Sequence, residues 1–143
     1  MSQSAFFNKL GAPLKNIQWS WGSVNMHKKT VYMKVWQDEI KQFDDKHFCL
    51  IVKDVNSYAH SNLGFKERMQ HIEMIKSGYA CYLIMCHYTG DIKNKKRISK
   101  VNELSVFKGG EIIEAEGSIW IEYAGRVPVS SLGDSDASAV ATH

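Results

Sequence analysis

The chain has 143 residues, a net charge of +3, and 44% hydrophobic and 23% charged residues, which are values typical of one globular domain. It contains no run of about eighteen apolar residues and no basic start followed by an apolar core, so we expect neither a membrane span nor a secretory signal. Its three cysteines all lie in apolar runs, which predicts reduced thiols in a cytoplasmic protein.

Two alternating runs near the N-terminus predict a β-hairpin. The first covers residues 17–24 and carries Trp21, and the second covers residues 30–37. Side chains alternate between the faces of a strand, so Tyr32 and Trp36 share the face opposite to the valines of the second run. If the valine face is core, the other face presents tyrosine and tryptophan outward. The acidic stretch that follows, 38–46, reads as a loop or a short helix.

A helix followed by a central strand is the clearest local pattern in the chain. Residues 63–77 carry one apolar stripe at helical spacing, with Asn62 as a cap before the helix and Gly78 as a stop after it. Residues 79–87 have no formal charge, which is typical of a strand that is covered on both faces. We therefore expect the helix to pack on the sheet that contains this strand.

The C-terminal half predicts further hairpin-connected strands. A strand is expected over 98–107, and a hairpin joins 111–115 to 118–123 around a Glu-Gly turn. Pro128 cannot donate to a strand ladder, so the segment around it is expected at an edge. Small polar residues fill 130–143 and predict a disordered tail.

These elements together predict the α+β class. Six or seven strands, mostly joined by hairpins, accompany one main helix at about 63–77. The expected architecture is a strongly bent, mostly antiparallel sheet or a small β-barrel with that helix packed against it. We expect a single domain over residues 1–129.

One pair of side chains on the predicted helix suggests acid–base chemistry. Glu67 and His71 are four residues apart, so they can touch, and a carboxylate that orients an imidazole is a known catalytic pairing. With Asp54, which precedes the helix, they are the candidates for a hydrolase or nuclease site. The alternative for such a pair is a surface contact on the helix flank.

No spacing in the chain predicts a metal or cofactor site. No two histidines stand four residues apart, and Cys81 and Cys86 are five apart on a strand, so they point to opposite faces. Phosphate-binding glycine loops and nucleophile elbows are also absent from the sequence. We therefore expect no cofactor and no bound metal.

Basic and aromatic residues suggest a nucleic-acid surface. A short segment concentrates lysine and arginine, which can hold phosphates, although a solvated loop has the same composition. Aromatic rings exposed beside it would suit base stacking, although most rings in such a domain are core. The expected nucleic-acid-binding residues are Trp21, Tyr32, Trp36, Lys93, Lys95, Lys96 and Arg97.

The layout resembles the PUA-like superfamily, including its EVE and ASCH branches. The resemblance rests on the early tryptophan-bearing strands QWSWGSV and TVYMKVWQDE, the helix before the central strand, and the closing hairpin EIIEAEGSIWIEY. It implies a compact bent barrel that reads RNA or modified bases in DNA. The chain also looks like small proteins carried on mobile elements and in integron cassettes.

We therefore expect a nucleic-acid-binding module that reads a modified or flipped base through an aromatic pocket. Its partner would be DNA or RNA, with no membrane. One alternative is a small-ligand-binding or protein-interaction domain, which includes a homodimer. The other alternative is the hydrolase or nuclease described above.

Overall fold

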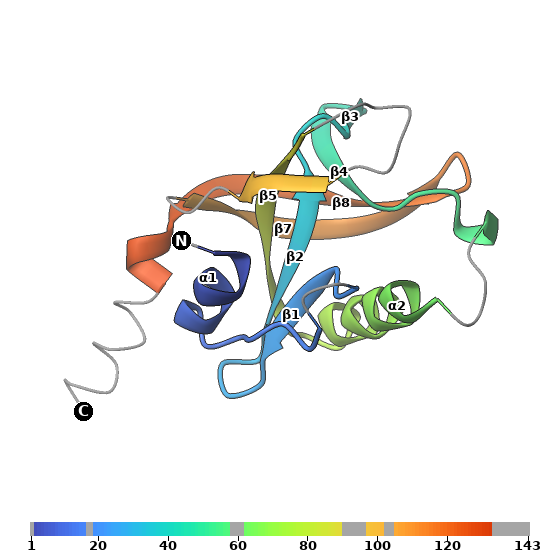
Figure 1. Cartoon of the computed structure of the whole chain (residues 1–143). Coiled ribbons are helices and arrows are strands. Elements are labelled where there is room, and N and C mark those ends of the chain that lie inside the picture. Colours follow the sequence, from blue (N-terminus) through green and yellow to red (C-terminus); the bar gives the residue numbers. More distant parts are fainter. Residues whose placement is uncertain (1, 17–18, 58–61, 90–96, 102–104, 133–143) are drawn as a thin grey trace.

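The computed structural model describes residues 2–16, 19–57, 62–89, 97–101 and 105–132 (Figure 1). The helices are α1 (Gln3–Lys9) and α2 (Leu63–Lys76), with a 3-10 turn at Val55–Ser57. The strands are β1 (Gly22–Asn25), β2 (Thr30–Trp36), β3 (Ile40–Phe43), β4 (Lys46–Val52), β5 (Ala80–Thr89), β6 (Arg97–Val101), β7 (Ser105–Ala115) and β8 (Ser118–Pro128). Neither described helix has the length and apolar character needed to cross a bilayer.

All eight strands belong to one bent sheet. Its order is β1-β2-β5-β7-β8-β4-β3, and β6 pairs with β5 beside this path. Among the strand pairs of the described residues, only β2 and β5 are parallel; the others are antiparallel. The α+β class and the mostly antiparallel sheet are thus confirmed. The described strands leave β1 and β3 as the two ends of the sheet, so they form an open sheet and not a closed barrel.

The helix and the strand after it form as the local signals predict. The Asn62 side chain accepts a hydrogen bond from the Phe65 N–H at 2.9 Å, and Gly78 follows the helix with a positive φ of 119°. Ile72, on the apolar stripe of α2, is buried in the first core. β5 lies between β2 and β7, which confirms a central strand.

The acidic stretch 38–46 folds differently from the expected loop or short helix. It forms β3 and the turn into β4, and Asp44 takes the left-handed φ of 55° at that turn. Ile40 and Phe43 supply the apolar side chains of this short edge strand, with polar residues between them. Strand pairing with β4, which a single-segment pattern does not contain, therefore decides the structure here.

β2 separates two cores, and this overturns the expectation that one of its faces points outward. Val31 and Met33 enter the first core, which α2 covers. Tyr32 enters a second core beneath α1, on the other side of β2 (Figure 1). Its ring is 1% exposed and stacks on Tyr82 with centroids 6.0 Å apart. The short helix α1, through Phe6, covers the face that was expected to be free.

Ordered structure continues beyond the boundary expected at residue 129. Val129 and Leu132 are both buried in the second core. The Lys28 ammonium donates a hydrogen bond to the Leu132 carbonyl at 3.3 Å. The rest of the expected tail, 133–143, lies outside the described residues.

A buried polar cluster as the candidate functional site

α2 buries a polar face as well as its apolar stripe. Glu67 is 8% exposed, Arg68 3% and His71 5%. Glu67 and His71 therefore do not form the surface contact that was the alternative for this pair, because the chain just before β1 covers this flank. Trp21 lies so close to the helix that a Cβ added at Gly64 would stand 2.2 Å from its indole Nε1.

Glu67 is held by the segment that covers it. Its Oε2 accepts a hydrogen bond from the Ser20 hydroxyl at 3.2 Å, and the carboxylate also accepts from the Trp21 backbone N–H. Burial raises the pKa of Glu67, and these hydrogen bonds oppose the shift. The second oxygen, Oε1, is buried and has no hydrogen-bond partner among the described residues.

Arg68 links three parts of the chain, namely α2, β2 and the segment before β1. Its Nη2 donates to the carbonyl oxygens of Trp21 and Lys34, both at 2.9 Å. The guanidinium carbon also lies 5.7 Å from the centroid of the Trp21 ring, within cation–π range. One side chain of α2 therefore positions both β2 and the tryptophan before β1.

His71 completes the group on the helix. Burial lowers the pKa of His71 to about 4, and the charges of Arg68 and Lys15 act in the same direction. The imidazole is consequently neutral at pH 7, and its buried Nδ1 has no hydrogen-bond partner among the described residues. We call Ser20, Trp21, Glu67, Arg68 and His71 the polar cluster.

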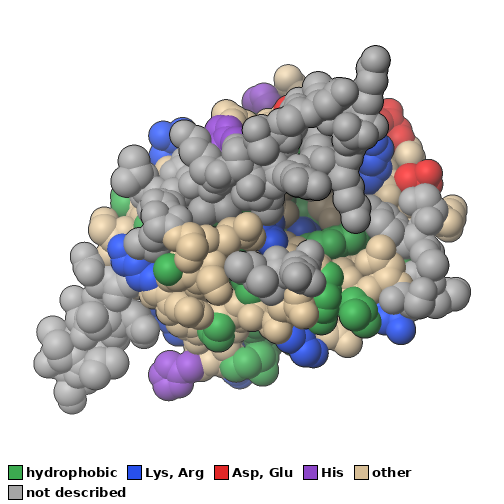
Figure 2. Space-filling model, viewed as in Figure 1, with side chains coloured by type: hydrophobic (Ala, Val, Ile, Leu, Met, Phe, Trp, Pro, Cys, Tyr) green, Lys and Arg blue, Asp and Glu red, His purple; other side chains and the backbone are tan. Residues whose placement is uncertain are grey.

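The polar cluster lies on the α2 side of the bent sheet, next to basic residues. Lys15 is exposed and near enough for its charge to act on both Glu67 and His71. Lys34 contacts the polar cluster through its carbonyl; burial lowers the pKa of its ammonium, and that group donates to the Gln3 side chain of α1 at 2.9 Å. Figure 2 shows this face of the molecule hollowed near its middle.

The structure brings only part of the expected site together. Trp21 is half-buried in the polar cluster, whereas Tyr32 and Trp36 lie in or against the second core. Tyr32 is too deeply buried for a ligand to reach its ring in this conformation. Asp54 is exposed in the turn after β4, where its N–H donates to the Ser118 hydroxyl at 2.8 Å, and it does not belong to the polar cluster.

The structure describes only a small part of the expected basic segment. Lys93, Lys95 and Lys96 lie outside the described residues. Arg97 begins β6, where its backbone pairs with Thr89, but its side chain is also outside the description. Phosphate binding by this segment therefore stays a prediction.

Sequence reasoning missed Ser20, Arg68 and Lys15 as members or neighbours of the site. A signal was available for one of them: Gly64, Glu67, Arg68 and His71 form a second stripe on the helix at spacings of three, one and three. A glycine inside such a stripe is typical of a close approach by another part of the chain. Nothing local, however, indicates which segment approaches.

Metal and thiol chemistry find no support in the described residues. Within the ranges that the structure describes, no group of three His, Cys, Asp or Glu side chains could hold a metal ion. Burial raises the pKa of the Cys49 and Cys81 thiols to about 12, and that of Cys86 to about 11. Such thiols are protonated at neutral pH and are poor nucleophiles.

No protein-family model, curated protein or solved structure matches this chain. The resemblance to PUA-like domains consequently stays a prediction. Function has to be argued from the geometry of the polar cluster and its surroundings.

Proposed function

We propose that this chain is a nucleic-acid-binding module that receives an unpaired or flipped base at the polar cluster. The observation that carries the proposal is a half-buried tryptophan beside two buried polar atoms, Glu67 Oε1 and His71 Nδ1, which the described residues leave without hydrogen bonds. Folded proteins pair nearly all such atoms, since each one left open costs about 1–3 kcal/mol. The edge of a base supplies the donors and acceptors that would satisfy them.

A base is recognised by stacking on its face and by hydrogen bonds to its edge, and this site offers groups for both. The Trp21 ring can stack on the face of any base, and Arg68 already lies against that ring. Glu67 and His71 are one helical turn apart on α2, so their open atoms face the same flank as the tryptophan. Stacking supplies affinity, and the buried atoms supply discrimination between base edges.

Positive charge near the polar cluster supports binding of the phosphate backbone. Lys15 is exposed next to the buried carboxylate and imidazole. The segment that carries Lys93, Lys95, Lys96 and Arg97 is the second expected source of phosphate contacts. Each phosphate contact releases counterions, so the affinity of such a module falls steeply with salt.

The polar cluster favours binding over hydrolysis. A general base works best when its pKa lies near the working pH, and the pKa of His71 is lowered to about 4. The Glu67 carboxylate is already engaged, because the Ser20 hydroxyl donates to its Oε2 and the Trp21 backbone N–H also donates to it. A nuclease built on this pair would need a general base with a pKa near the working pH, and His71 does not supply one.

The proposal is tested by fluorescence binding of two DNA duplexes that differ at one position. One duplex is fully paired and the other carries a single mismatched base, which is easier to extrude. We expect tighter binding of the mismatched duplex, lost in Trp21→Leu. Trp36→Leu is the matched control, because Trp36 packs against the second core, which lies on the other side of β2.

A salt series separates phosphate contacts from base reading. Lys15→Gln should lower the slope of log affinity against log salt by about one, since one phosphate contact is lost. Lys53→Gln, an exposed lysine after β4, should leave the slope unchanged. Equal affinity for the two duplexes, or an equal loss in both tryptophan variants, would remove the polar cluster from the proposal.

A further inference from the structure

Four planar side chains form a line across β4, β8 and β7. The His47 and Tyr123 rings lie with centroids 5.9 Å apart, and Tyr123 packs edge-to-face on Phe107 at 5.5 Å. The guanidinium carbon of Arg126 stands 5.3 Å from the centroid of the Phe107 ring. The two inner rings are half-buried against the first core, whereas His47 and Arg126 at the two ends are exposed. We call these four side chains the planar row.

The two exposed groups of the planar row are already ordered by the rings behind them. Arg126 rests on Phe107, and His47 lies beside Tyr123. A side chain that is held in place before binding loses less conformational entropy when a ligand arrives. The outer faces of the guanidinium and the imidazole are therefore preorganised for a flat ligand.

The chemistry of the planar row fits a nucleotide. Unpaired bases stack on aromatic rings and on the planes of arginine guanidinium groups. The N–H groups of the same guanidinium can donate to a phosphate oxygen. An acidic peptide would use the charge of Arg126 but not its plane, whereas a nucleotide offers a flat base and a phosphate together.

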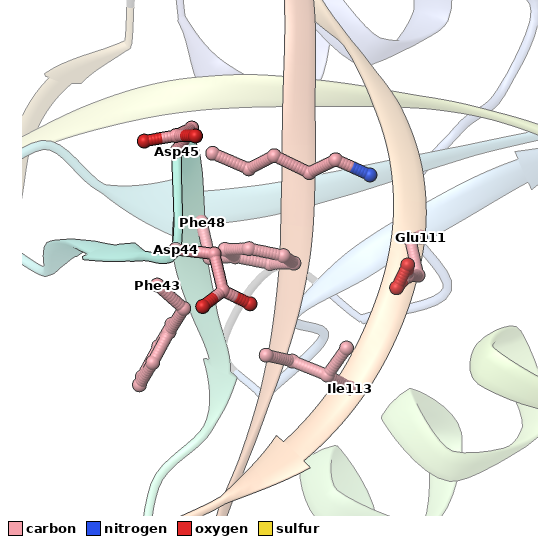
Figure 3. Close-up of a pocket in the computed structure, with 7 residues that line it drawn as sticks. Phe43, Asp44, Asp45, Phe48, Glu111 and Ile113 are labelled. Atoms are coloured by element: carbon pink, nitrogen blue, oxygen red, sulfur yellow. The ribbon is translucent and has the colours of Figure 1, made fainter.

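The other face of the same strands is acidic. Figure 3 shows a hollow on this face, and its charged lining residues are Asp44, Asp45, Lys46 and Glu111. Glu122 pairs with Phe48, the neighbour of the core residue Cys49, so alternation places it on this face as well. Carboxylates repel phosphate, so charge restricts a nucleic-acid strand to the α2 side of the sheet, where the planar row and the polar cluster lie.

Strand pairing places the planar row in line with the polar cluster. Trp21 precedes β1, and the successive partners across the sheet from there are Gly22, Met33, Leu83, Phe107 and Arg126. Three strand spacings of about 4.8 Å separate β1 from β7, so the two ends of this line lie about 14 Å apart. Met33 and Leu83 are buried between them. A stacked strand with about 3.4 Å per base needs about five nucleotides to reach both ends.

We propose that the planar row stacks a second base of the strand whose unpaired base the polar cluster receives. The inference rests on the proposed function and extends it from one base to a single-stranded segment. Arg126 supplies the stacking plane for this base and a hydrogen bond to its phosphate. This chemistry is common to DNA and RNA.

The test measures the affinity of the full chain for labelled octamers of thymidine and of uridine at one low salt concentration. Both octamers are long enough to span the two surfaces, and their comparison distinguishes DNA from RNA. Arg126→Met should weaken octamer binding about tenfold, because one base stack is lost. Arg126→Lys keeps the charge but not the plane, so we expect a loss of at least about threefold. The preference of Arg126→Met for a mismatched duplex should stay unchanged, since the polar cluster reads that base.

Lys53→Met is the matched control, because it removes one exposed positive charge after β4 and should leave octamer binding unchanged. An equal loss in Arg126→Met and Lys53→Met, or full octamer affinity in Arg126→Lys, would overturn stacking on the planar row. Octamer binding that is unaffected by Arg126→Met, with the mismatch preference intact, would overturn this inference alone. No binding of either octamer or of the duplexes would overturn the proposed function as well.

Discussion

Two arginines of this protein lie over aromatic rings, in different surroundings. Arg68 stands 5.7 Å from the Trp21 ring and is 3% exposed. Arg126 stands 5.3 Å from the Phe107 ring and is exposed. The distances are nearly equal and both lie within cation–π range. Apart from the type of ring, the two pairs differ in burial and in what else the guanidinium contacts.

Because of this difference, the Arg68–Trp21 pair holds the fold together, whereas the Arg126–Phe107 pair can be lost without harm to it. Arg68 also donates to two backbone carbonyls, so its removal would leave buried acceptors without partners. Arg126 is at the surface, where water can replace any contact that it loses. Phe107 beneath it packs edge-to-face on Tyr123, with centroids 5.5 Å apart, and needs no cation to stay in place. Burial therefore decides what the same contact does.

The largest expected effect is a loss of stability in Arg68→Met. Methionine keeps part of the apolar stem but leaves the carbonyls of Trp21 and Lys34 without their donor. We expect the free energy of unfolding to fall by about 3 kcal/mol, measured by urea denaturation. The matched change, Arg126→Met, should cost less than about 0.5 kcal/mol. Equal costs would show that burial does not separate the two pairs.

A loss of stability of similar size is expected when the pH falls below the ordinary pKa of His71. Its pKa is about 4 in the folded chain against 6.5 ordinarily, so between these values the unfolded chain binds the proton more strongly. The contribution of His71 to the free energy of unfolding should thus fall by about 3 kcal/mol as the pH drops from 6.5 to 4. The raised pKa of Glu67 acts with the opposite sign, because its contribution is lost as pH rises.

The difference between the natural chain and His71→Gln isolates the histidine. Denaturation curves of both proteins should be recorded from pH 4 to pH 7. The difference in their free energies of unfolding should grow with pH and level off above about 6.5. A difference that stays constant over this range would mean that the pKa of the imidazole is the same in the folded and the unfolded chain.

A smaller effect is expected from Gly64→Ala, which pushes Trp21 away from Arg68. The new Cβ would stand 2.2 Å from the indole Nε1 and 2.7 Å from the Trp19 carbonyl oxygen. Overpacking should destabilise the fold more than the higher helix propensity of alanine stabilises it. We expect the free energy of unfolding to fall by about 1–2 kcal/mol. Gly125→Ala meets no atom within 4 Å and should be nearly neutral. A neutral Gly64→Ala would show that the cover over the polar cluster moves freely.

Much of the fold could be predicted because its signals are local. The cap at Asn62, the stripe through Ile72 and the stop at Gly78 lie within one short stretch and set the limits of α2. The β7–β8 hairpin turns at Glu116 and Gly117, both with positive φ, a conformation that glycine adopts readily. Residues that meet within a few positions of each other carry this information in their own order.

The candidate site could be predicted only in part. Glu67, His71 and Trp21 were identified from the sequence, but the first two as an acid–base or surface pair and Trp21 as a separate stacking ring. Their meeting depends on contacts across 47 residues, such as the hydrogen bond from Ser20 to Glu67. No periodicity within one element contains a contact of that range.

The sequence by itself therefore determined α2 with its capping, the central strand after it, the β7–β8 hairpin and the alternating pattern of β2. The tertiary structure alone decided which faces are covered: α1 buries Tyr32, and the segment before β1 buries the polar flank of α2. Alternation and helical spacing depend on backbone geometry, which each segment carries with it. Burial depends on which distant segment arrives, and only the packing of the whole chain settles that.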